Sequence, residues 1–142
     1  MKKRISLLFL LLPLGLFAQS LKVLNLQCEY KTNPLGIESL KPKLSWQMQS
    51  DAHSTLQTAY RVLVAGDAAK LKSNIADIWD SGKVSSGASL QVSCNGKPMQ
   101  AAKTYYWKVM VWDNHGKASA WSNTASWQMG LLTKKTGMVP IG

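Results

Sequence analysis

The clearest hydrophobic pattern in the chain covers residues 105–113. Large apolar side chains recur there at every second position: Tyr105, Trp107, Val109 and Val111. The residues between them form the opposite face of the same extended segment: Tyr106, Lys108, Met110 and Trp112. A period of two indicates a β-strand, and aromatic and β-branched residues favour that structure. We therefore predict a central strand whose first face is buried, followed by a turn at residues 113–116.

Six further segments read as strands, and turn-forming residues such as Asn95-Gly96 separate them. We expect these strands at residues 21–30, 44–48, 58–65, 78–79, 89–94 and 124–129. In the first of them the alternation predicts four inward side chains: Leu24, Leu26, Cys28 and Tyr30. A single helical turn is expected at residues 68–72, after the third strand.

Seven short strands separated by turns are typical of an all-β, antiparallel sandwich of the immunoglobulin or fibronectin type III kind. Trp46 and Trp107 would fill the core between its two sheets. Met99 lies six residues before Tyr105. This spacing matches a tyrosine corner, in which the phenol oxygen holds the preceding loop. We expect one such domain over residues 21–132 and a linker or frayed end over residues 133–142.

The amino terminus has the pattern of a secretory signal peptide. Three basic residues, at positions 2–4, precede an apolar run over residues 7–17, and the small residue Ala18 follows. The run is shorter than the roughly 20 residues that a membrane helix needs. We therefore expect a signal peptide over residues 1–18, export to the periplasm or the medium, and no membrane span in the mature protein.

The charge pattern argues against a nucleic-acid partner. The chain has 17 basic and 7 acidic residues, and cleavage would remove three of the basic ones, which leaves a net charge of +7. The lysines are scattered along the sequence, whereas a nucleic-acid-binding protein concentrates them on one face within a recognisable motif. We interpret them as solvated surface.

Two cysteines are present, Cys28 and Cys94, and two interpretations of them stay open. Export permits a disulfide, but the sequence alone does not show whether the two side chains meet. His53 and His115 stand alone in turn-like surroundings, without ligand spacing to the cysteines. The sequence therefore predicts neither a metal site nor a cofactor site.

The outward side chains of the strand at 105–113 have binding potential. Tyr106 and Trp112 could stack on sugar rings, as a carbohydrate-binding platform does. Lys108 lies between them on the same face, and Trp121 follows nearby in the sequence. A cation–π stack that only covers the sheet is therefore a second interpretation. Packing against a neighbouring domain is a third.

A series of short strings runs through the whole predicted domain. In chain order they are Cys28-Glu29-Tyr30, Asn33-Pro34-Leu35-Gly36-Ile37, Pro42-Lys43-Leu44-Ser45-Trp46, Gln57-Thr58-Ala59-Tyr60-Arg61-Val62-Leu63-Val64, Trp79-Asp80-Ser81-Gly82-Lys83-Val84, Tyr105-Tyr106-Trp107-Lys108-Val109, Val111-Trp112-Asp113, Trp121-Ser122 and Met129-Gly130-Leu131. Together they resemble the N-terminal module of bacterial α-L-rhamnosidases, the glycoside hydrolases of family 78.

The resemblance implies a fibronectin-type sandwich that is a non-catalytic accessory domain of a secreted enzyme. The parent would hydrolyse terminal α-L-rhamnosyl bonds with acids in an α/α-barrel that follows further β-domains. Residues 136–140 depart from the family's tryptophan-bearing entry to the next domain. We therefore expect a chain that stops before the barrel, through truncation, a frame shift or deliberate shortening. The expected partners are the downstream domains of the parent and rhamnose-containing glycans.

The residues themselves predict no catalytic site. Inverting glycoside hydrolysis uses two carboxyl groups about 6.5–9.5 Å apart, whereas the seven acids here fall at outward strand positions, loops or turns. Asp80 and Asp113 are expected to cap their own turns. No serine lies in a Gly-x-Ser-x-Gly elbow, and no glycine-rich phosphate loop follows a strand. Two alternatives to the accessory domain stay open, a stand-alone carbohydrate-binding module and a protein-interaction module.

Overall fold

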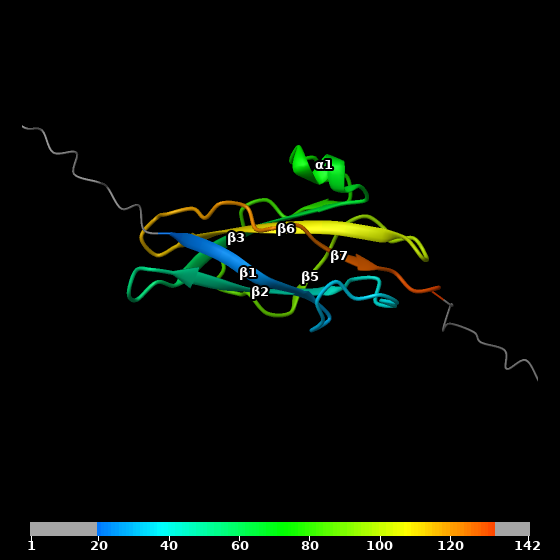
Figure 1. Ribbon diagram of the computed structural model, residues 1–142, viewed down its shortest axis with the longest axis horizontal. Helices are drawn as coiled ribbons and strands as arrows, with labels where there is room; N and C mark the ends of the chain where they lie inside the picture. Colours follow the sequence, from blue (N-terminus) through cyan, green and yellow to red (C-terminus); the bar gives the residue numbers. More distant parts are fainter. Residues whose placement is uncertain (1–19, 133–142) are drawn as a thin grey trace, which may run out of the picture.

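The computed structural model describes residues 20–132, and the expected signal peptide and C-terminal linker lie outside this range. Seven strands and one short helix follow in order: β1 (Leu21–Cys28), β2 (Lys43–Ser50), β3 (Gln57–Ala65), α1 (Ala68–Lys72), β4 (Trp79–Asp80), β5 (Val92–Ser93), β6 (Thr104–Asp113) and β7 (Ala125–Gln128). The strands form two facing layers, which confirms the predicted sandwich (Figure 1). Within the described range, no helix has the length and apolar character to cross a membrane.

The two layers contain three and four strands. One sheet has the order β1-β2-β5, and the other has the order β4-β3-β6-β7. In a constant-type immunoglobulin domain the fourth strand joins the first sheet, whereas β4 here pairs with β3. β3 and β6 pair antiparallel along nearly their whole length. They are the central pair on which the outer face of the larger sheet is built.

The inward faces of both sheets enclose the core. The predicted inward face of β6 is at most 1% exposed: Tyr105, Trp107, Val109 and Val111. Trp46 and Trp127 are equally buried, and the Trp46 ring packs edge-on against Tyr60 with its centroid 5.2 Å away. The Tyr105 hydroxyl accepts a hydrogen bond from Gln100 N at 2.7 Å, which confirms the tyrosine corner.

In β1 the predicted alternation is wrong at two of four positions. Leu24 is only half-buried and Tyr30 is 66% exposed, while Val23 is buried instead. The pairing of β1 with β2 shifts register between Leu24 and Gln27. Asn25 there has a φ of 53°, in the left-handed region. Such a bulge adds an unpaired residue to one strand and moves the alternation to the other face.

β5 is shorter than the strand predicted at residues 89–94, because only two residues pair with β2. Gln91 has a φ of 59° and interrupts the extended backbone. Its N–H donates to Ser45 Oγ at 3.2 Å instead of continuing the ladder. The short strand predicted at residues 78–79 is displaced by one residue, to 79–80.

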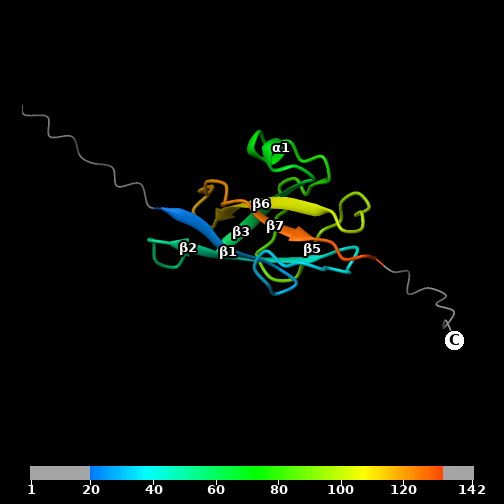
Figure 2. The same cartoon turned by 45° about the vertical axis from the view of Figure 1, so that its right-hand side comes forward.

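A second, smaller apolar cluster lies on the outer face of the larger sheet. Leu63 and Ala65 of β3 point away from the main core, and Leu71 of α1 covers them. α1 coincides with the predicted helical turn and starts after Asp67, whose carboxylate accepts a hydrogen bond from Ala69 N at 2.7 Å. Figures 1 and 2 both show α1 outside the sandwich, over this sheet.

β6 is longer than its neighbour β7, and two serines pair with the remaining backbone. Val109 N donates to Ser122 Oγ and Val111 N to Ser119 Oγ, each at 3.0 Å. The backbone N–H groups of these serines donate back to the carbonyls of the same valines. The segment between β6 and β7 therefore follows β6 closely, and it brings Trp121 to the outer cluster.

Candidate functional site

Three of the four side chains predicted to form a binding or packing surface come together beside α1. Tyr106 and Lys108 belong to the outward face of β6, and Trp121 belongs to the segment before β7. Tyr106 and Trp121 pack against the cluster that Leu71 covers. Lys108 is only 7% exposed. This part of the sheet is thus a covered surface with a buried lysine.

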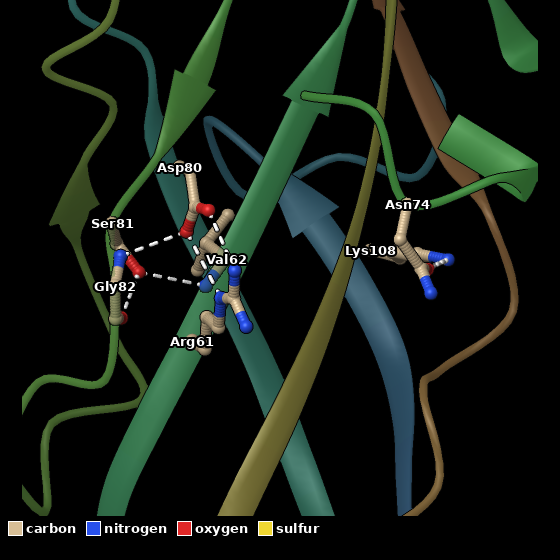
Figure 3. A network of polar contacts seen from close by, with 7 residues as sticks. All are labelled: Arg61, Val62, Asn74, Asp80, Ser81, Gly82 and Lys108. Carbon is tan, nitrogen blue, oxygen red and sulfur yellow. Dashed lines mark hydrogen bonds and ion pairs between the residues drawn. The ribbon is translucent and has the colours of Figure 1, made fainter. Parts of the chain in front are cut away.

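An amide and an indole hold the ammonium group of Lys108. Its Nζ donates a hydrogen bond to Asn74 Oδ1 (Figure 3) and lies 4.9 Å from the centroid of the Trp121 ring. Neither ion pair found among residues 20–132 includes Lys108. Burial lowers the pKa of Lys108, because the charged form loses water and gains no full counter-charge.

Trp112, the fourth predicted residue, has a different lysine neighbour. Lys83 Nζ, from the segment after β4, lies 4.6 Å from the centroid of its ring. The sequence placed Lys108 between Tyr106 and Trp112, whereas the structure sets Lys108 against Trp121. One flat face of each indole is therefore covered by a lysine. A sugar platform would need such a face to be free.

Two of the residues that complete this surface, Lys83 and Asn74, were not identified from the sequence. Lys83 follows the turn after β4, so it reaches β6 only because β4 pairs with β3. Asn74 has a φ of 58°, in the left-handed region that asparagine tolerates. An asparagine just after a predicted helical turn was the available signal, but its distance from Lys108 in the sequence gave no indication of contact.

An ion pair fastens β4 to β3 on the same outer face (Figure 3). Arg61 Nε and Nη2 donate to the two oxygens of Asp80 at 3.0 and 2.7 Å. Gly82 N donates to Asp80 Oδ1 at 2.9 Å, so Asp80 caps its own turn, as predicted. Hydrogen bonding from Arg61 lowers the pKa of the Asp80 carboxyl group. Both side chains are about 40% exposed.

The fold itself uses most of the carboxyl groups. Six of the seven accept hydrogen bonds from neighbouring backbone, hydroxyl or basic groups: Glu29, Asp51, Asp67, Asp77, Asp80 and Asp113. Asp113 Oδ1 accepts from His115 N at 2.9 Å and Lys117 N at 2.8 Å, so this residue also caps its turn, as predicted. Among residues 20–132, no three histidine, cysteine or acidic side chains gather closely enough to hold a metal ion.

Cys28 and Cys94 are buried free thiols. They belong to β1 and to the segment just after β5, the two strands that flank β2. Burial raises the pKa of Cys28 to about 12 and that of Cys94 to about 11. Of the two interpretations that the sequence left open, the structure has the free thiols.

Two adjoining hollows follow the outer edge of β1. Their volumes are about 360 and 250 Å³, and both are lined by Val23, Leu24 and Asn123. The larger one extends to Asn33, and the smaller one extends to Trp121. Trp121 is the one predicted site residue that borders them. The hollows therefore adjoin the candidate surface only at its margin.

Comparison with known proteins gives a consistent set of matches. The family model of the Rha78A-like, N-terminal immunoglobulin domain matches residues 23–133. An α-L-rhamnosidase of Formosa agariphila is 45% identical over 102 residues, which cover 72% of this chain and 11% of that protein. An α-L-rhamnosidase of Streptomyces avermitilis is 43% identical over 113 residues, which cover 80% and 11%. The chain thus spans about a tenth of the length of these relatives.

Solved structures agree with these matches. The S. avermitilis α-L-rhamnosidase, determined in complex with L-rhamnose, superposes with a TM-score of 0.75 at 43% identity, over 80% of this chain and 11% of that one. The α-L-rhamnosidase of Dictyoglumus thermophilum gives a TM-score of 0.77 at 34% identity, over 80% and 13%. The enzyme of Aspergillus terreus, with 21% identity and a TM-score of 0.67, supports the fold alone.

Proposed function

The chain belongs to the family of Rha78A-like N-terminal immunoglobulin domains, and from this premise we propose that it is a non-catalytic accessory domain of an α-L-rhamnosidase. The parent enzyme would hydrolyse terminal α-L-rhamnosyl bonds. One observation carries the proposal. At 43–45% identity, the chain matches a region that makes up 11% of the length of each relative. The remaining length of such an enzyme is available for the catalytic part.

The carboxyl groups of the domain support a non-catalytic role. Hydrolysis of a glycosidic bond by an inverting enzyme needs two carboxyl groups that face one sugar from opposite sides. Here Asp80 is paired with Arg61 and Asp77 with Lys70, each at 3.0 Å or less. Asp113 is engaged in its own turn. Groups that hold strands and turns together are poorly placed to exchange protons with a substrate.

The outer face of the larger sheet is best explained as a packing surface. Lysines cover one face of Trp121 and one face of Trp112, and Tyr106 is packed against the small cluster below α1. This arrangement gives stiffness and a finished surface for contact with the rest of the enzyme. Were it a sugar platform, rhamnose would quench tryptophan fluorescence saturably and Trp112→Ala would abolish the quench. We expect no such response.

We also propose that residues 1–18 are a signal peptide and that the parent is exported. The support for this part of the proposal is the charged and apolar pattern of the first 18 residues. Residues 133–142 would then connect the domain to the polypeptide that follows.

A domain replacement in the S. avermitilis relative tests the accessory role. Removing its matching N-terminal part should lower the thermal stability of that enzyme, since the contacts between the two parts are lost. A hybrid that has residues 20–132 of this chain in its place should regain stability. The hybrid should hydrolyse an aryl α-L-rhamnoside, while the 142-residue chain alone should release no rhamnose.

The control is a hybrid that has an unrelated immunoglobulin-type sandwich of similar size at the same position. Our proposal requires the present domain to restore more stability than this control does. A present-domain hybrid no more stable than the deletion variant would overturn the accessory role. Rhamnose release by the chain alone, persisting after repurification, would overturn its non-catalytic character.

A further inference from the structure

Large apolar side chains are exposed at the end of the sandwich from which the chain leaves. Four of the seven exposed large hydrophobic residues of the described range lie shortly after β1 or after β7: Tyr30, Leu35, Leu40 and Leu131. Leu35 and Leu131 are the most exposed of the seven, at 78% and 77%. Figure 1 shows the loop after β1 and the segment after β7 at the same end of the molecule. Exposed apolar residues grouped in this way mark interaction sites.

Leu35 and Leu131 are presented by two backbones in close contact. Each is next to a glycine, and a Cβ atom added to Gly130 would lie 3.4 Å from the carbonyl carbon and oxygen of Gly36. Gly130 N also donates a hydrogen bond to Ile37 O at 2.7 Å. The two leucines therefore flank one joined piece of backbone.

The segment that leads out of the domain is also held on its other side. Met129 N donates to Lys103 O at 2.9 Å, and Ala102 N donates to Gly130 O at 3.0 Å. The direction of the chain is thus fixed as far as residue 130. The loop after β1 and the segment before β6 clamp it between them.

We infer that Leu35 and Leu131 are the centre of a docking surface for the domain that follows this one in the parent enzyme, and that this domain meets them with an apolar patch of its own. The inference rests on the proposed function. A domain attached just beyond Leu131 meets this surface at high effective concentration, because the connection is short. The fixed direction of the exit reduces the freedom that is lost when the contact forms.

Hydrogen–deuterium exchange compares this surface with and without its neighbour. The samples are the 142-residue chain and the hybrid with the S. avermitilis enzyme described above. We expect amides of residues 31–41 to exchange at least about tenfold more slowly in the hybrid, because docking suppresses local opening. Amides at the opposite end, around Leu56, should exchange equally in both.

Paired substitutions then assign the effect to the two leucines. The variant Leu35→Ser with Leu131→Ser should lose the protection of residues 31–41 in the hybrid. In the 142-residue chain it should melt like the parent, since both side chains are already in water. The matched control is Leu56→Ser with Leu90→Ser, two leucines that are each 67% exposed and lie away from the exit. This control should keep the protection.

The outcomes separate this inference from the proposed function. A hybrid that is active and stabilised, but whose residues 31–41 exchange as in the chain alone, would overturn the docking surface only. A hybrid no more stable than the deletion variant would overturn the proposed function, and the inference with it. Protection that instead appears in the chain alone and grows with its concentration, together with dimers in sedimentation, would assign the surface to a second copy and overturn the inference.

Discussion

Lys108 shows at the residue scale how one charged side chain is accommodated on a covered sheet. Its ammonium group exchanges water for an amide oxygen and the face of an indole. A cation over an indole contributes about 0.5–2 kcal/mol, depending on desolvation. Burial of the charge works in the opposite direction and lowers the pKa of Lys108. The balance between these two effects depends on pH.

The pH dependence of Lys108 has a defined sign. Below its folded-state pKa, both states carry the proton, and the cost of burying the charge is present in full. As the pH rises from that pKa toward the ordinary value of 10.5, the folded state releases its proton before the unfolded state does. The free energy of unfolding of the parent should therefore rise relative to that of Lys108→Met over this interval.

Urea unfolding of the parent and of Lys108→Met at a series of alkaline pH values measures this difference. Lys41→Met is the matched control, because Lys41 is exposed and its charge stays in water in both states. The difference from Lys108→Met should grow with pH, and the difference from Lys41→Met should stay flat. A Lys108→Met difference that is flat, or that shrinks with rising pH, would contradict a buried ammonium.

Backbone pairing at the element scale depends on serine side chains where the strands run out. β7 covers only part of β6, and Ser119 and Ser122 complete the hydrogen bonds of the exposed remainder. Ser81 has the same role beside the short β4, where its Oγ accepts from Val62 N at 2.8 Å. The valines that donate these bonds are fully buried. An unpaired N–H there would have no access to water.

We expect Ser122→Ala to cost about 1–3 kcal/mol of the free energy of unfolding, the range for leaving a buried donor unsatisfied. Asp80→Asn removes half of an exposed ion pair, and such pairs contribute about 0.2–1 kcal/mol. Urea unfolding near pH 7 should therefore rank the serine variant as the less stable. The reverse order would show that β4 is held chiefly by its ion pair.

The ion pair has its own dependence on pH. Because Arg61 lowers the pKa of Asp80, its stabilising effect is present above the ordinary carboxyl value of 3.8. It is lost as the pH falls through the lower, folded-state pKa. The small cost of Asp80→Asn should accordingly disappear in strong acid, while the cost of Ser122→Ala should not.

The core acts as a unit at the scale of the whole molecule, and its two thiols report on it. Cys28 and Cys94 lie in the main core between the sheets. At pH 8 a thiol with a pKa of about 11, as in Cys94, is about one part in a thousand ionised. An unfolded thiol with a pKa of about 8.5 is ionised to about a quarter. Since the thiolate is the reactive species, folding should protect both cysteines.

Native protein should therefore react with a disulfide reagent such as Ellman's only as fast as it unfolds. The rate should rise with denaturant in parallel with the unfolding rate measured by circular dichroism, and two thiols per chain should react in full denaturant. Fast reaction of one thiol in native buffer would contradict a single cooperative core. It would indicate local opening of the sheet that contains β1 and β5.

Much of the fold follows from alternation, because a strand between core and solvent must place apolar residues at every second position. This reasoning found all seven strands, α1, the buried face of β6 and the corner at Tyr105. It failed in β1, where the bulge at Asn25 moved Leu24 and Tyr30 out of the core. Alternation assumes regular backbone, and a left-handed residue breaks that assumption without an unambiguous sequence signal.

The sequence by itself determined that this protein is an antiparallel β-sandwich, and it identified the outward aromatic residues of β6. Only the tertiary structure decided which lysine meets which indole, that α1 covers Leu63, and that the two cysteines stay apart as free thiols. The physical reason is range. Alternation reports how each residue divides between core and solvent, whereas these contacts join segments that only sheet order and register bring together.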